Sequence, residues 1–239
     1  MPVARSSDWK RATIALLLFS VSFGYLEAAV VAYLRALNEP VRQRFNPARE
    51  PDDMFPLLKL DQVKAAGPEL VWLLKIELAR EAATLFMLAA VGIMVGRNGG
   101  QTLAAFSIAF GTWDIAFYAF LRLLLHWPRS LLTWDLLFLI PVPWAAPVMG
   151  PVLVSLSMIG AGFVYLGLEW TGRRARLRPL HWLGVFTGGL ILMIAFTWDF
   201  HNITAGGMPH PFNWPLFALG EMTGLGAFLH AILTRSDEC

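Results

Sequence analysis

The chain has 239 residues, of which 56% are hydrophobic and 15% are charged, and its mean hydropathy is +0.55. This balance lies outside the usual range of a soluble domain and is typical of a protein that crosses a membrane several times. The formal net charge of +2 is too small to indicate a nucleic-acid partner. The single cysteine, Cys239, excludes an intrachain disulfide and a cysteine-based metal cluster.

The first apolar run follows three basic residues and has no small-residue cleavage site, so we expect a retained membrane span over residues 12–36. Within it, Glu27 shares one helical face with Ser20 and Gly24, because the three lie at positions i, i+4 and i+7. The other faces of this helix are apolar. The carboxylate of Glu27 is therefore expected to point at protein rather than lipid.

Residues 37–67 are polar and interrupted by prolines, and we expect them to form a loop outside the membrane. A short amphipathic helix is expected within this loop near residues 55–64. Loops of this length are often functional, but an ordinary interfacial loop is the simpler interpretation.

The second predicted span, residues 68–96, contains Lys75, Glu77, Arg80 and Glu81 in an otherwise apolar run. An ionisable side chain at mid-bilayer costs roughly 2.5 to 3.5 kcal/mol, so such residues usually face a bundle interior or a wet cavity. Glu77 and Glu81 share a helical face, and Arg80 lies beside Glu77 at i+3. The pattern indicates a polar interior in the folded bundle.

The third predicted span, residues 101–127, contains Asp114, Tyr118 and Arg122 at i, i+4 and i+8. These three residues form a polar stripe along one side of an apolar helix, and His126 extends it by one further turn.

The segment that follows, residues 128–140, is too short to span a bilayer. Pro128 suits the first turn of a helix, whereas Pro141 and Pro143 prevent the helix from continuing. We expect a short interfacial or re-entrant helix here, between the third and fourth spans.

Three further apolar runs complete the predicted all-α, six-helix membrane bundle, at residues 147–170, 180–198 and 213–234. The last two contain glycine pairs at small-xxx-small spacing, Gly184 with Gly188 and Gly220 with Gly224. Such faces allow close helix contact and could join the chain to other membrane subunits or to a second copy of itself.

The whole chain, residues 1–239, is expected to form a single membrane domain. Placing both ends of the chain in the cytoplasm puts nine lysines and arginines on the inner side and six on the outer side. The positive-inside rule therefore favours this orientation in a bacterial-type inner membrane, and an even number of spans agrees with it.

With this orientation, four carboxylates from four different helices lie about 12 to 20 Å below the outer surface, given a rise of about 1.5 Å per residue. They belong to Glu27, Glu81, Asp114 and Glu221. We predict that they meet in a polar core that opens to the outer face. Its predicted members are Glu27, Glu77, Glu81, Asp114, Glu221, Arg80, Arg122 and Tyr118.

The charges in this core do not balance. Lys75, Arg80 and Arg122 can neutralise three of its five acids, which leaves two that must be protonated, hydrogen-bonded or bound to a cation. The favoured function is therefore the binding or transport of a proton, a cation or a small lipid-soluble molecule.

Two other functions are consistent with the same residues. A membrane enzyme could use the carboxylates to hold a divalent or transition metal, although no Glu-x-x-His pair occurs on any span. A second metal site could form at the rim from His126, Asp199 and His201. Alternatively, the acids and arginines pair only to fix helix register in an accessory subunit of a membrane complex.

Overall fold

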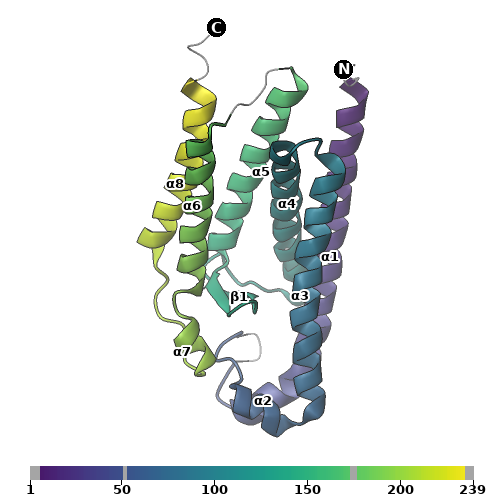
Figure 1. Ribbon diagram of the computed structural model, residues 1–239. Coiled ribbons are helices and arrows are strands. Elements are labelled where there is room, and N and C mark those ends of the chain that lie inside the picture. The colour runs from purple at the N-terminus through teal and green to yellow at the C-terminus, as the bar shows by residue number, and fades with distance from the viewer. Residues whose placement is uncertain (1–5, 51–52, 173–176, 235–239) are drawn as a thin grey trace.

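The computed structural model describes residues 6–50, 53–172 and 177–234. Within them, six helices are long and apolar enough to cross a membrane, and they stand side by side in one bundle (Figure 1). This confirms the predicted all-α bundle of a polytopic membrane protein. The six are α1 (Ser6–Phe45), α3 (Pro68–Val95), α4 (Gly99–Leu125), α5 (Met149–Trp170), α6 (Pro179–Thr197) and α8 (Trp214–Leu233).

The start of α1 and the end of α8 lie at the same end of the bundle, which we call the terminal end (Figure 1). The opposite end, which we call the loop end, holds two short helices, α2 (Leu60–Ala66) and α7 (Phe200–Thr204). Helix α2 corresponds to the short helix expected near residues 55–64. Helix α7 was not predicted.

The spanning helices divide into two groups. Helix α4 packs against α1, α3 and α5, whereas α6 packs chiefly against α8. The α6–α8 pair meets the other group through α5 and through a strand at the loop end. In the view of Figure 1, α3 and α6 therefore stand on opposite sides of the front of the bundle.

The glycine faces of α6 and α8 are used inside the chain. A Cβ atom on Gly188 would lie 2.5 Å from the backbone nitrogen of Gly224 and 2.7 Å from the carbonyl oxygen of Gly220. A Cβ on Gly184 would lie 2.5 Å from the Cβ of Ala227. The two glycine faces therefore pack on each other within one bundle, and contact with other membrane subunits or with a second copy stays a prediction.

The segment expected to form an interfacial or re-entrant helix, residues 128–140, instead contains the first strand of a β-hairpin. Strand β1 (Trp134–Phe138) pairs antiparallel with β2 (Trp144–Pro147). The aromatic residues Trp134, Phe138 and Trp144 favour strands, and Pro141 and Pro143 lie in the connection, where a missing N–H removes no ladder hydrogen bond. The hairpin lies toward the loop end of the bundle interior (Figure 1).

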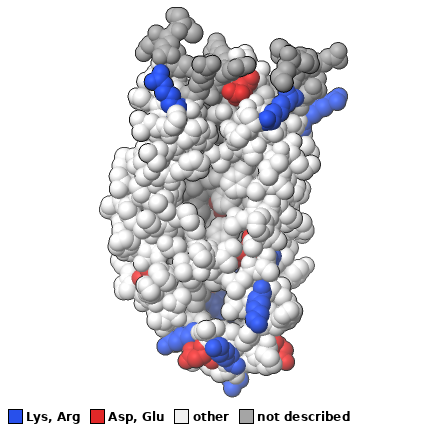
Figure 2. Space-filling view, in the orientation of Figure 1, with Lys and Arg blue, Asp and Glu red and all other residues white. Residues whose placement is uncertain are grey.

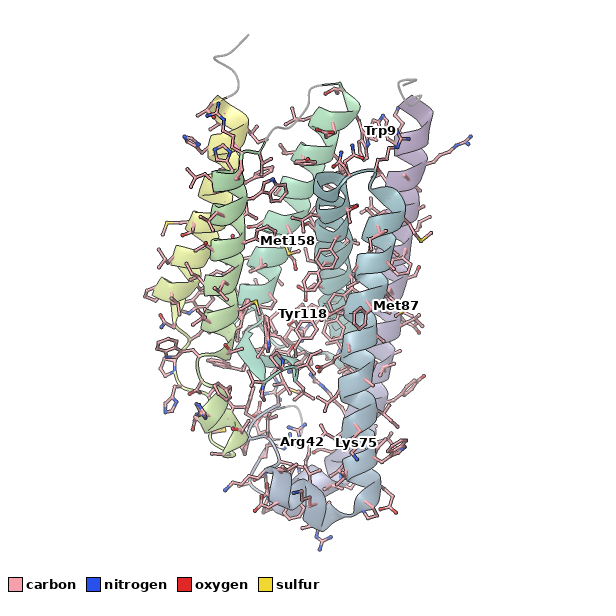
Figure 3. The ribbon with its side chains drawn as sticks, in the orientation of Figure 1. Trp9, Arg42, Lys75, Met87, Tyr118 and Met158 are labelled. Atoms are coloured by element: carbon pink, nitrogen blue, oxygen red, sulfur yellow. The ribbon has the colours of Figure 1, made fainter. Side chains whose placement is uncertain are left out.

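Helix α1 is longer than predicted and continues from residue 36 to Phe45, so part of the expected loop is helical. The guanidinium of Arg42 donates hydrogen bonds to the carbonyl oxygens of Asp53 at 2.8 Å and Met54 at 2.6 Å. These bonds tie the extension to the chain that follows it. In Figure 3, Arg42 lies near the loop end, beyond the level of Tyr118.

Candidate functional site

A cavity of about 860 Å³ lies inside the bundle. Its wall is formed by the helices α1 to α7, the hairpin and the loop that precedes α2. Figure 2 shows a hollow in the front face with acidic atoms visible inside it. Phe186 and Met193 on α6 belong to the wall and are 62% and 43% exposed. The cavity, which we call the main cavity, therefore opens on the flank that faces lipid.

Charged side chains of both signs line the main cavity, and acids outnumber arginines by five to three. The acids are Glu27, Glu77, Glu81, Asp114 and Asp135, and the arginines are Arg35, Arg42 and Arg80. Six predicted members of the polar core lie in this wall: Glu27, Glu77, Arg80, Glu81, Asp114 and Tyr118. The rest of the wall is mostly apolar and aromatic.

Arg80 lies between two glutamates and joins α3 to α1. Its Nε donates to Glu77 at 2.8 Å and its Nη2 donates to the same carboxylate at 2.5 Å, while its Nη1 pairs with Glu27. The hydroxyl of Thr84 donates to Glu27 at 2.7 Å. This network satisfies both carboxylates and fixes the register of the two helices, as expected of structural ion pairs.

Glu81 and Asp114 differ from these two glutamates because, in the described part of the chain, neither forms an ion pair. Glu81 is 5% exposed and accepts the backbone N–H of Leu139 at 2.8 Å. Asp114 is 7% exposed and accepts the hydroxyl of Ser155 at 2.8 Å. A neutral donor compensates a buried carboxylate only in part, so these two acids hold the unbalanced charge of the cavity.

Asp135 on β1 is buried and accepts a hydrogen bond from the hydroxyl of Tyr118 at 2.9 Å. Burial raises the pKa of Asp135 from its ordinary value of 3.8 to about 6, although the charge of Arg35 and the hydrogen bond from Tyr118 both oppose the increase. The guanidinium of Arg35 also lies 3.9 Å from the centre of the Trp127 ring.

The polar core predicted from sequence did not include Arg35 or Asp135. Arg35 lies at the predicted end of the first span and enters the interior because α1 continues beyond it. Asp135 is the single polar residue in the apolar run of residues 134–140, and the local pattern does not reveal that the hairpin turns it inward.

Two predicted core residues lie apart from the main cavity. Glu221 lines a second cavity of about 300 Å³ between α5, α6 and α8, and accepts the hydroxyl of Ser157 at 3.0 Å. Arg122 is exposed and donates to the carbonyl oxygens of His126 at 2.5 Å and Pro128 at 3.2 Å. Its charge therefore caps the C-terminal end of α4.

The residues proposed for a rim metal site are not gathered around one point. Asp199 accepts the backbone N–H of His210 at 2.9 Å and contacts its ring Nδ1 at 2.8 Å, whereas the ring of His201 lies on Phe200 at 3.8 Å. Among residues 6–50, 53–172 and 177–234, no three His, Cys, Asp or Glu side chains are placed to hold a metal ion.

No protein-family model, curated protein or solved structure matches this chain. Its function must therefore be argued from the chemistry and geometry of the main cavity.

Proposed function

We propose that this protein binds a small lipid-soluble molecule, which reaches the main cavity from the bilayer between α3 and α6. The position of the cavity is the observation that carries the proposal, because its mouth lies on the lipid-facing flank and its wall is largely apolar. Its volume of about 860 Å³ falls in the range of small-molecule sites.

Glu81 and Asp114 are the groups that we assign to the polar head of the ligand. Each is buried in the wall with neutral hydrogen-bond donors, so a donor or a proton brought by the ligand would lower the cost of its charge. The same two carboxyls are therefore the candidate proton or cation acceptors of the site.

Neither alternative explains the main cavity as well. The Glu27–Arg80–Glu77 network has the geometry of a structural pairing, but it leaves Glu81 and Asp114 unpaired in the described chain. A metal-dependent reaction would need a group of ligands, and the described residues provide none of three or more. Binding of a lipid-soluble molecule uses both the apolar wall and the unpaired acids.

Photolabelling with a small apolar diazirine tests the proposal. Met158 lines the main cavity where it adjoins the second cavity, whereas Met222 is exposed on α8 and lines neither, so we expect both to be labelled in membranes. The variant Gly189→Phe places a ring in the wall that the two cavities share, where a Cβ meets no atom within 4 Å, and should remove labelling of Met158 alone. Gly226→Phe, at an equally open glycine outside both cavities, is the matched control.

Labelling of Met158 that matches Met222 in every variant would show that no separate binding space exists, and would overturn the proposal.

We also propose that the membrane is a bacterial-type inner membrane and that both ends of the chain lie in the cytoplasm. The excess of basic residues at the terminal end supports this orientation. Five of these nine residues lie outside the described part of the chain: Arg5, Arg173, Arg174, Arg176 and Arg235. Cys239, which also lies outside them, is the single cysteine of the chain and serves as a reporter.

A membrane-impermeant maleimide should label Cys239 in permeabilised spheroplasts but not in intact ones. In a Cys239→Ser background, Lys64→Cys on α2 should be labelled in both, because α2 lies at the opposite end of the bundle. The reverse pattern would invert the orientation.

A further inference from the structure

Three polar atoms of neutral side chains in the main-cavity wall are buried and have no hydrogen-bond partner in the described chain. They are the indole Nε1 donors of Trp113 and Trp144 and the amide Oδ1 acceptor of Asn38. Trp113 is 6% exposed, so no bulk water compensates its indole N–H. An unpartnered buried polar atom costs free energy, and because these three residues line the main cavity, a molecule bound there is the partner that we assign to them.

The cavity wall therefore needs both an acceptor and a donor from its ligand. The two indole groups require an acceptor. Glu81 and Asp114 require a donor when ionised and can serve as donors when protonated. The polar head of the ligand must therefore accept hydrogen bonds from the indoles in either protonation state of Glu81 and Asp114. When these two acids are ionised, it must also donate hydrogen bonds to them.

Charged head groups meet only half of this requirement. An ammonium donates to the acids but accepts nothing from Trp113 or Trp144. A carboxylate or phosphate accepts from the indoles but is repelled by a wall in which acids outnumber arginines by five to three. A hydroxyl both donates and accepts, so it suits either protonation state of Glu81 and Asp114.

We infer that the ligand is an uncharged alcohol or phenol with an apolar body, an inference that rests on the proposed function. The aromatic side chains of the wall suit an unsaturated chain or a ring, since they offer flat apolar faces. Those on α4 and α6 are Phe106, Phe110, Phe117, Phe186 and Phe196.

Four probes that share the same hydrocarbon chain and differ in their polar head test this inference. They are farnesol, farnesyl methyl ether, farnesylamine and farnesoic acid. Each is partitioned between nanodiscs that contain the full-length protein and nanodiscs that contain lipid alone, and the excess bound gives its affinity. We expect farnesol to bind about tenfold tighter than the methyl ether, which accepts a hydrogen bond but cannot donate one. The amine and the acid should also bind more weakly than farnesol.

Substitutions assign the effect to named groups. Trp113→Phe removes the indole N–H and keeps an aromatic ring, so farnesol should lose about tenfold in affinity while farnesylamine is unchanged. Trp214→Phe is the control, because Trp214 on α8 lines neither cavity. Asp114→Leu should reduce the advantage of farnesol over its ether, whereas Asp114→Asn, which keeps a donor and an acceptor, should retain most of it.

The outcomes separate this inference from the proposed function. If farnesylamine binds tightest, or if farnesol and its ether bind equally, the hydroxyl inference is overturned while the cavity still holds a lipid-soluble ligand. If no probe binds above the lipid level and Gly189→Phe leaves the labelling of Met158 unchanged, the proposed function fails as well.

Discussion

The carboxylate of Glu81, on α3, accepts a hydrogen bond from the backbone N–H of Leu139 at 2.8 Å, and so joins a spanning helix to the β-hairpin. A second bond, from Tyr118 on α4 to Asp135 on β1, holds the same hairpin to another helix. Both acceptors are buried carboxyls in the wall of the main cavity. The position of the hairpin at the loop end of the cavity is therefore linked to Glu81, one of the two acids that we assign to the site.

Replacing Glu81 should loosen the hairpin. Glu81→Leu leaves the N–H of Leu139 without its acceptor, so we expect amide exchange in the hairpin to be about tenfold faster, as for a lost hydrogen bond of roughly 1.4 kcal/mol. Glu81→Gln keeps a carbonyl oxygen and should exchange at nearly the wild-type rate. Hydrogen–deuterium exchange of peptides that contain β1 measures the difference. Equal rates in the two variants would show that this bond does not hold the hairpin.

Removing Arg80 should destabilise the bundle strongly. Arg80→Leu leaves Glu27 and Glu77 without their shared cation, and breaking such a pair typically costs about 3 kcal/mol. Adding Glu27→Gln and Glu77→Gln to this variant should recover most of the loss, because the orphaned charges are then gone. The free energy of unfolding in mixed detergent micelles reports the effect.

Arg122→Leu is the matched control for Arg80→Leu. Arg122 is exposed and contacts only backbone carbonyls at the end of α4 in the described structure, so its loss should cost less than about 1 kcal/mol. Equal losses in the two variants would contradict a buried network at Arg80.

The six spans could be predicted from sequence because an apolar run of about 20 residues is long enough to cross a bilayer and rarely occurs in soluble domains. The hairpin could not, because a short apolar run such as residues 134–140 suits a strand or a buried helix equally well. Pairing with β2, beyond two prolines, decides between them. That pairing is a tertiary contact that local pattern does not reveal.

The candidate site could likewise be predicted from sequence only in part. Helical spacing placed Glu27, Glu81 and Asp114 on inward faces, and the structure puts all three in one cavity wall. Glu221 has similar spacing but lies in the second cavity, because close glycine contacts turn α8 against α6. Arg35 was missed because its depth depends on how far α1 extends, which the contacts of Arg42 help to set.

Stability should depend on pH through Asp135. Its pKa is raised to about 6 in the folded protein, so the folded state binds this proton more tightly than the unfolded state does. This contribution to stability is fully present below about pH 4, is lost as the pH rises through about 6, and amounts to roughly 3 kcal/mol. Asp135→Asn should remove it, so the difference between the unfolding free energies of wild type and variant should change across this range.

Tyr118→Phe extends this test. The hydroxyl of Tyr118 lowers the pKa of Asp135 by donating to its carboxylate, so its removal should move the midpoint of the pH dependence upward. A midpoint that stays in place would show that the hydrogen bond does not tune this acid. A wild-type curve parallel to that of Asp135→Asn between pH 4 and 7 would contradict the assignment to Asp135.

Close packing of α6 on α8 should depend on Gly188. A methyl group there would lie 2.5 Å from the backbone nitrogen of Gly224, and neither backbone can move without separating the helices. We expect Gly188→Ala to lower the free energy of unfolding by about 1 to 3 kcal/mol. Gly226→Ala, where a Cβ meets no atom within 4 Å, should change it by less than about 1 kcal/mol. Because α6 forms one side of the cavity mouth, Gly188→Ala should also weaken farnesol binding, whereas an unchanged affinity would separate the glycine contact from the site.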